Sequence, residues 1–320
     1  MFSGILKTRQ GHVEAQKPLE WGKIDLHGNI VGSHDFPTVS TYLRSTFKPL
    51  QSTALFHTIA QIAPELLLEI PTEAWVIASS SHSGEAVHQH WVQWWLNDAG
   101  LSREDAEHGL VCGVHPPLYG ALELIQEVPS VLHHNCSGQH AMMLALAKRL
   151  NLPMVNYHLP EHPLFQDILS FMHLHTPVDA THLWGTDGCQ LPTPYLSLEE
   201  ALCFMHSYAQ GSLGDMMLKW MKMHPHLVAG SHRFDTVLGQ MPLPIISKGG
   251  AEGLVVLWNL ETRETLIIKS LAGDPAARDA FAWHLLAHLG WIAPELAIHE
   301  SPLVDSSPFS TVQSDLQFLF

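Results

Sequence analysis

A serine and a lysine three residues apart, Ser45 and Lys48, stand at the start of an apolar segment. On a helix, positions i and i+3 lie on one face, so the hydroxyl and the amine can approach hydrogen-bond distance. A neutral lysine could then take the hydroxyl proton and make the serine a nucleophile without a histidine. The lysine pKa must first fall from about 10.4 towards 7, which burial and a second nearby cation can bring about. Because S-x-x-K also occurs by chance in long chains, this pair alone does not establish catalysis.

Three further polar stretches follow in chain order: Ser81-His82-Ser83, Asn135-Cys136-Ser137-Gly138 and Lys248-Gly249-Gly250. Serine β-lactamases and penicillin-binding proteins have the same succession of S-x-x-K, a serine-bearing loop and K-[T/S]-G. In that plan the second serine relays a proton, and the late lysine lowers other lysine pKa values and attracts a substrate carboxylate. Glycines beside it let substrate approach the strand backbone. The ordered set favours a serine-lysine hydrolase over coincidence.

The sequence around these stretches predicts the elements that position them. Residues 1–40 read as strands and turns, and a helix follows Lys48 to about Leu68. Pro49 is tolerated only in a first helical turn, so we expect Ser45 at the exposed start of that helix. The apolar run at 74–78 predicts a buried strand ahead of Ser81.

Helical spacing recurs through the middle of the chain, and strand patterns return near its end. We predict a helix that starts near Val87 and ends just before Gly100, a loop followed by a helix within residues 131–151, and further helices at about 163–174, 198–209 and 214–223. Two β-rich runs at 254–258 and 265–269 predict a hairpin. A last helix has Asp274 as N-cap and Pro275 as first residue, and stops at Gly290. The sequence does not place residues 301–320.

This order of strands, helices and strands predicts an α/β (α+β) protein. One sheet is built from both chain ends, and a helical subdomain is inserted between them. We expect a single catalytic unit over residues 1–320, with residues 1–44 and 240–320 containing the sheet and residues 45–239 mainly helical.

Composition narrows the possible partners. The formal net charge of −15 argues against nucleic acid and anionic membranes as partners, since both require basic patches. No apolar run reaches the roughly 18 residues of a membrane span. Four cysteines in 320 residues do not form a disulfide framework, so we expect a reduced, cytoplasmic protein. The 24 histidines are scattered rather than set at ligand spacing.

Together these motifs resemble the thermolabile, rhizobial-type L-asparaginase family. The matching stretches are Arg44-Ser45-x-x-Lys48-Pro49-x-Gln51, Ser81-His82-Ser83-Gly84-Glu85, His134-Asn135-Cys136-Ser137-Gly138-x-His140, Asp187-Gly188-Cys189 and Lys248-Gly249-Gly250-Ala251-Glu252-Gly253. The resemblance implies a β-lactamase/transpeptidase-like fold, hydrolysis of L-asparagine to aspartate and ammonia, and a homodimer.

The resemblance also implies roles at individual positions. Ser45 and Lys48 match the first Ser-Lys pair of the family, and Ser81 and Lys248 match the second. The positions that match residues lining the substrate pocket are Arg44, His140, Asp187 and Gly249. Those that match two ligands of a zinc site beside the substrate are Cys136 and Cys189.

Two departures bear on these implied roles. Gln139 stands where the family has the lysine that is its third zinc ligand, and the early V-E-S-x-H stretch appears only as Val13-Glu14-Ala15-Gln16-Lys17. An amide oxygen is a poor third ligand for zinc, so Cys136 and Cys189 are either a weakened zinc site or two free thiols. Cys136 starts a predicted helix, whose dipole favours the thiolate. We expect no cofactor to be required.

From the sequence we therefore predict an asparagine amidohydrolase. Ser45 attacks with Lys48 as base, Ser81 and Lys248 relay the proton to the leaving ammonia, and the backbone N–H of Ser45 stabilises the oxyanion. Two alternatives stay open: a glutaminase or other serine-lysine hydrolase, and a non-catalytic amino-acid-binding paralogue.

Overall fold

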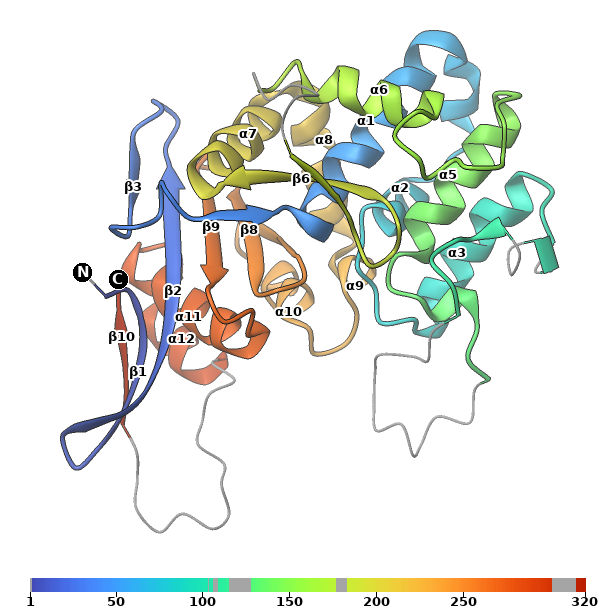
Figure 1. The fold of residues 1–320 in the computed structure, drawn as a ribbon. Helices are drawn as coiled ribbons and strands as arrows, with labels where there is room; N and C mark the ends of the chain where they lie inside the picture. The colour runs from blue at the N-terminus through green and yellow to red at the C-terminus, as the bar shows by residue number, and fades with distance from the viewer. Residues whose placement is uncertain (1, 103, 106–108, 115–127, 177–182, 301–314) are drawn as a thin grey trace.

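A large antiparallel sheet brings the two ends of the chain together. The computed structural model describes residues 2–102, 104–105, 109–114, 128–176, 183–300 and 315–320. Within these residues, seven strands form the sheet in the order β10-β1-β2-β9-β8-β7, with β3 paired to β2. Their bounds are β1 (Gly4–Arg9), β2 (His12–Ile24), β3 (Ile30–Gly32), β7 (Ile245–Gly249), β8 (Leu254–Asn259), β9 (Thr265–Ser270) and β10 (Asp315–Leu319). Figure 1 shows the strands β1 and β2 from the start of the chain beside their partners β10 and β9 from its end.

The middle of the chain is mainly helical and lies to one side of the sheet (Figure 1). Its helices are α1 (Lys48–Ile62), α2 (Thr72–Ala78), α3 (Ala86–Asp98), α5 (Ser137–Arg149), α6 (Pro163–Met172), α7 (Leu198–Gln210), α8 (Ser212–Met223), α9 (Pro225–Val228) and α10 (Phe234–Gln240). It also holds the 3-10 turns η1 (Arg44–Phe47), η2 (Pro64–Leu68) and η4 (Val131–His133), and a small sheet of β4 (Ser40–Tyr42), β6 (Pro192–Ser197) and β5 (Trp184–Thr186). After the last central strand come α11 (Pro275–His288) and α12 (Pro294–Glu300). The predicted architecture, a sheet from both chain ends with helices inserted, is confirmed.

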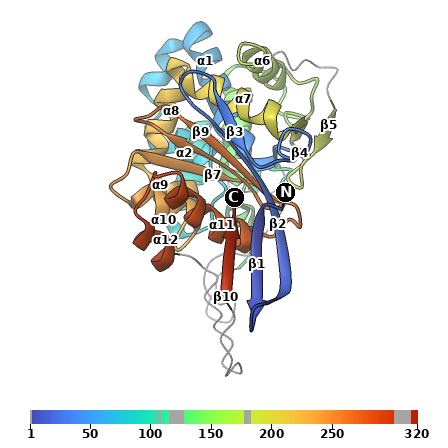
Figure 2. The ribbon, with the colours of Figure 1, turned by 90° about the vertical axis from the view of Figure 1, so that its left-hand side faces the viewer.

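The central strands are buried on both faces. Along β8, Leu254, Val256 and Trp258 belong to one apolar cluster, whereas Val255 and Leu257 belong to another. This alternation follows from the two-residue period of a strand. Helix α7 packs against the sheet on the side of the first cluster and α11 on the side of the second (Figure 2).

Local sequence signals fix where helix α11 begins and ends. The Asp274 side chain accepts a hydrogen bond from the backbone of Ala277 and so caps α11, as predicted. Gly290 follows that helix with φ of 73°, a conformation that favours glycine.

No helix within the described residues is long and apolar enough to cross a membrane.

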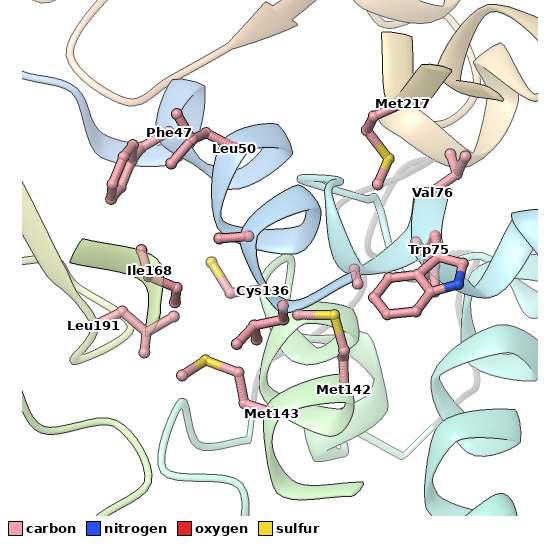
Figure 3. Close-up of a cluster of buried hydrophobic side chains, with 14 of the residues drawn as sticks. Phe47, Leu50, Trp75, Val76, Cys136, Met142, Met143, Ile168, Leu191 and Met217 are labelled. Carbon is pink, nitrogen blue, oxygen red and sulfur yellow. The ribbon is translucent and has the colours of Figure 1, made fainter. Parts of the chain in front are cut away.

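The predicted strand at residues 74–78 is wrong, because this run is the body of α2. All five of its side chains are buried, so the run shows neither helical nor strand periodicity. The helix-start signals are Pro71 at the N-cap and Glu73 in the first turn. Helix α2 and the start of α5 border the same apolar cluster, in which Figure 3 shows Trp75 and the sulfur of Cys136.

Candidate active site

Most of the predicted site residues surround one cavity of about 420 Å³. They come from the start of η1, the loop after α2, the start of α5, the turn after β5 and the end of β7. The predicted residues that line it are Arg44, Ser45, Ser81, Cys136, Asp187, Cys189 and Gly249. Segments spread over more than 200 residues of sequence therefore converge on a single site.

A buried serine-lysine pair is preformed at this cavity. Lys248 Nζ lies 2.8 Å from Ser81 Oγ and 2.7 Å from the carbonyl oxygen of Gly249. Burial lowers the pKa of Lys248 to about 7; Asp235 opposes this shift and Lys48 assists it. Near neutral pH the amine is therefore deprotonated in a large fraction of molecules, which suits it to accept a proton from a hydroxyl.

Backbone contacts hold Ser81 in place against the helical region. Its N–H donates to the carbonyl oxygen of Val228 at 3.0 Å, and the N–H of His82 donates to that of Asn135 at 3.2 Å. The His82 ring contacts Ser137 Oγ at 3.1 Å and accepts a hydrogen bond from the backbone of Gly84. Burial lowers the pKa of His82 well below its usual value, so this ring is a neutral support for the loop.

Ser45 and Lys48 lie differently from the prediction. Ser45 is in a 3-10 turn before α1 and is 7% exposed, so the expected exposed helix start is wrong. Its hydroxyl has no hydrogen-bond partner in the described part of the chain. Lys48 is 2% exposed, does not line the cavity and donates to the carbonyl oxygen of Ser80 at 2.7 Å. The structure therefore has no hydrogen bond between the side chains of Ser45 and Lys48.

The residue before Ser45 is held in an unusual backbone conformation. Arg44 has a backbone φ of 50°, a value that residues other than glycine seldom adopt. Its N–H donates to Thr193 Oγ1 at 2.8 Å, and its Nε lies 2.7 Å from Asp187 Oδ1. Such strain typically costs about 1–3 kcal/mol and persists where surrounding contacts fix it. These two contacts orient the turn that carries Ser45.

Glycines allow β7 to approach that turn closely. A Cβ on Gly250 would lie 3.1 Å from Thr46 Cγ2, and one on Gly249 would lie 3.0 Å from Asp235 Oδ2. The buried Asp235 also accepts hydrogen bonds from Ser247 Oγ at 2.6 Å and from the backbone N–H of Gly249 at 3.1 Å. Gly249 and Gly250 thus line the same cavity as Ser45, and the buried Lys248 before them reaches that cavity through its contact with Ser81.

Comparison with known proteins identifies the family of this chain. The family model described as L-asparaginase II matches residues 5–308, nearly the whole chain. The chain belongs to the L-asparaginase II family. A search of curated proteins finds no match.

Two of the solved structures that are similar to this L-asparaginase II family member have 13% and 14% sequence identity with it. One is a crystal structure of Mglu in its native form, 13% identical, with a TM-score of 0.38 over 86% of this chain. The chain covers 65% of the length of Mglu. The other is a β-lactamase from Desulfarculus baarsii, 14% identical, with a TM-score of 0.39 over 86% of this chain and 92% of that one.

The donor set beside the cavity does not fit the zinc site that the resemblance implies. Cys136 and Cys189 are both buried and share a hydrogen bond, which lowers the pKa of Cys136 and raises that of Cys189. Gln139 donates from Nε2 to Gln51 Oε1 at 2.6 Å, and its own buried Oε1 has no partner within the described residues. No group of three or more His, Cys, Asp or Glu within those residues is arranged to hold a metal. Two thiols and a neutral amide fall short of the donor set of a zinc site.

His140 is not in the cavity wall that the structure describes. It is fully buried, and its Nδ1 lies 2.7 Å from the hydroxyl of Tyr157. Burial lowers the pKa of His140 to about 3, so the ring is neutral. The implied substrate contact of His140 is therefore not made from the cavity surface in this structure.

Three charged residues in the cavity wall had no role predicted from the sequence: Arg233, Glu252 and Arg278. Arg278 lies on the buried side of α11, and an arginine at a buried position of an apolar helix is a signal that could have identified it. Arg233 caps α10 just after the turn-rich Gly230-Ser231-His232. No hydrophobic periodicity in the sequence marked Arg233 as a site residue.

Proposed function

We propose that this protein hydrolyses the side-chain amide of L-asparagine to L-aspartate and ammonia by a serine-lysine mechanism. Membership of the L-asparaginase II family supports the substrate class. The observation that carries the mechanism is the 2.8 Å contact between Lys248 and Ser81 at the cavity, together with a Lys248 pKa of about 7.

In the proposed reaction, Ser45 attacks the amide carbon. Its hydroxyl is free of partners in the described structure, whereas the Ser81 oxygen is held by Lys248. The Ser45 proton passes through Ser81 to Lys248, and the same path returns it to the departing ammonia. Water then hydrolyses the aspartyl ester on Ser45, again with Lys248 as base, and the free serine is restored. The proposed oxyanion donor is the backbone N–H of Ser45, in the first turn of η1.

Lys48 takes a different part in this scheme from the one predicted from the sequence. It is tied to the carbonyl oxygen of Ser80, and its charge lowers the pKa of Lys248. We therefore assign it an electrostatic role and give the role of base to Lys248.

An ammonia-release assay with a substrate panel tests the proposed activity. We expect L-asparagine to be the preferred substrate over L-glutamine and over ester and β-lactam substrates. One methylene typically changes the rate by about 10- to 200-fold, so the two amides need full kcat/KM values. A higher kcat/KM for glutamine, or for an ester, would replace asparagine as the substrate. Binding of aspartate without ammonia release from either amide would favour a non-catalytic binding protein.

A further inference from the structure

The cavity contains three arginines, and their bonding states differ. Arg44 is paired with Asp187 at 2.7 Å. Arg278 donates from Nε to Asp279 Oδ1 at 2.7 Å and from Nη1 to the carbonyl oxygen of Leu254 at 2.9 Å. These two guanidinium groups are therefore largely neutralised and oriented by the protein itself.

Arg233 is different from both. Its side chain is half-buried in the cavity wall, yet its guanidinium forms no hydrogen bond or ion pair with any described residue. No hydrogen bond or ion pair joins it to its neighbour Asp235, whose carboxylate accepts hydrogen bonds from Ser247 and from the backbone of Gly249. The positive charge of Arg233 is felt within the site, where it lowers the pKa of Lys248. A half-buried guanidinium without a partner has its donor groups available for an anionic ligand.

The backbone fixes where this guanidinium begins. Arg233 is the N-cap residue of α10, and its N–H donates to the carbonyl oxygen of Gly230 at 3.3 Å. Helix α10 packs against β7, the strand that ends in Lys248 and Gly249. Arg233 is therefore anchored on a rigid element beside the strand that carries the proposed base.

The other cation that could bind a substrate carboxylate is already occupied. Lys248 is fully buried, and its amine is bound to Ser81 Oγ and to the carbonyl oxygen of Gly249. A carboxylate seated on Lys248 would also hold it protonated and prevent it from acting as a base.

We propose that Arg233 binds the α-carboxylate of the amide substrate and thereby makes the site specific for amino-acid amides. This inference rests on the proposed function. With the side-chain amide at Ser45, the α-carboxylate of asparagine must lie elsewhere in the same cavity. The planar guanidinium fork matches a carboxylate in a bidentate manner, which lysine cannot reproduce.

The test compares two amides in the unmodified protein and in three variants. The substrates are L-asparagine and 3-aminopropanamide, which is asparagine without its α-carboxylate. The variants are Arg233→Gln and Arg233→Lys, with Arg9→Gln on the exposed β1–β2 hairpin as a control for loss of one positive charge. We expect Arg233→Gln to lower kcat/KM for asparagine about 100-fold, mainly through KM, because a charged hydrogen-bonded contact is lost. Because Arg233 also lowers the pKa of Lys248, rates are compared on the high-pH plateau, where Lys248 is deprotonated in every protein. There the same variant should leave 3-aminopropanamide within about twofold, and Arg233→Lys should recover part of the loss.

Equal losses for both amides in Arg233→Gln would mean that the residue is only structural, and would overturn the inference while the proposed hydrolysis stands. If the unmodified protein hydrolyses neither amide, the proposed function fails and calorimetric titration decides the inference separately. L-Aspartate should then bind the unmodified protein about 100-fold more tightly than Arg233→Gln, with β-alanine binding both alike. Absence of aspartate binding to the unmodified protein, or equal binding to the variant, would overturn it.

Discussion

Two buried lysines lie under the same cavity, but their hydrogen-bond partners suit them to different tasks. Lys48 donates to a backbone carbonyl oxygen, which cannot give up a proton. Lys248 contacts a serine hydroxyl, which can. The pKa of Lys248, lowered to about 7 mainly by burial, lets the amine cycle between its two protonation states near neutral pH.

This pKa predicts how activity depends on pH. Lys248 must be deprotonated to act as a base, so kcat/KM for asparagine should rise with pH through about 7 and level off above it.

Lys248→Met should lower kcat about a thousandfold with little change in KM, because the lost interaction forms in the transition state. Steady-state ammonia release at several pH values measures both effects, and Lys219→Met, in an exposed ion pair with Asp215, is the matched control. A pH-independent profile, or an effect of Lys248→Met on KM alone, would exclude Lys248 as the base.

The order of the motifs and the resemblance to the L-asparaginase family indicated which residues gather at the cavity better than local spacing indicated their contacts. Ser45, Ser81 and Asp187 line it as expected. The predicted hydrogen bond between Ser45 and Lys48 is wrong. The i, i+3 rule considers the helix alone, whereas Lys48 donates its hydrogen bond to the backbone carbonyl oxygen of Ser80. Such a competing acceptor comes from a distant part of the chain and is invisible in a local motif.

At the scale of elements, glycine positions decide how closely the site-bearing segments approach. Gly138, in the first turn of α5, packs directly against the end of α2. A Cβ at this position would lie 2.3 Å from the carbonyl oxygen of Ile77, which is backbone and cannot easily move. Ser81 follows α2 and Cys136 precedes α5, so this contact sets the spacing of two cavity walls.

Gly138→Ala should therefore lower the free energy of unfolding by about 3 kcal/mol, as expected for overpacking in a closely packed interior. Ammonia release should fall as well, because α2 and α5 would move apart. Denaturant titration measures the stability. The control is Gly211→Ala, where φ is −71° and a Cβ would lie 3.3 Å from the nearest atom, His175 Cε1; its cost should not exceed about 1 kcal/mol. Equal stability losses for the two variants would contradict this account of the α2–α5 contact.

Elements with local signals were predictable, and those defined by burial alone were not. Helix α11 was predicted from Asp274, Pro275 and Gly290, because capping chemistry is local. Helix α2 was mistaken for a strand, because a fully buried segment carries no amphipathic pattern. The cavity position of Arg233 also depends on tertiary packing of α10 on β7, which no local pattern reports.

At the scale of the whole molecule, the sheet is completed only when both chain ends have been made. Strand β2 pairs with β9, and β1 pairs with β10, across more than 200 residues of sequence. Lys248 lies on β7 at the edge of this sheet, whereas Ser45 and Ser81 come from the helical region. The proposed proton path therefore crosses the junction between these two parts of the fold, and a catalytic site requires both.

The measurement that tests this account most directly is ammonia release from L-asparagine by Ser45→Ala beside the unmodified protein. The hydroxyl of Ser45 has no partner in the described structure, so its loss should change the free energy of unfolding by no more than about 1 kcal/mol. The account predicts that the unmodified protein releases ammonia and that the variant, equally folded by thermal denaturation, does so at least about a thousandfold more slowly. A folded Ser45→Ala variant that retains a tenth or more of the activity would contradict the account and transfer the role of nucleophile to Ser81.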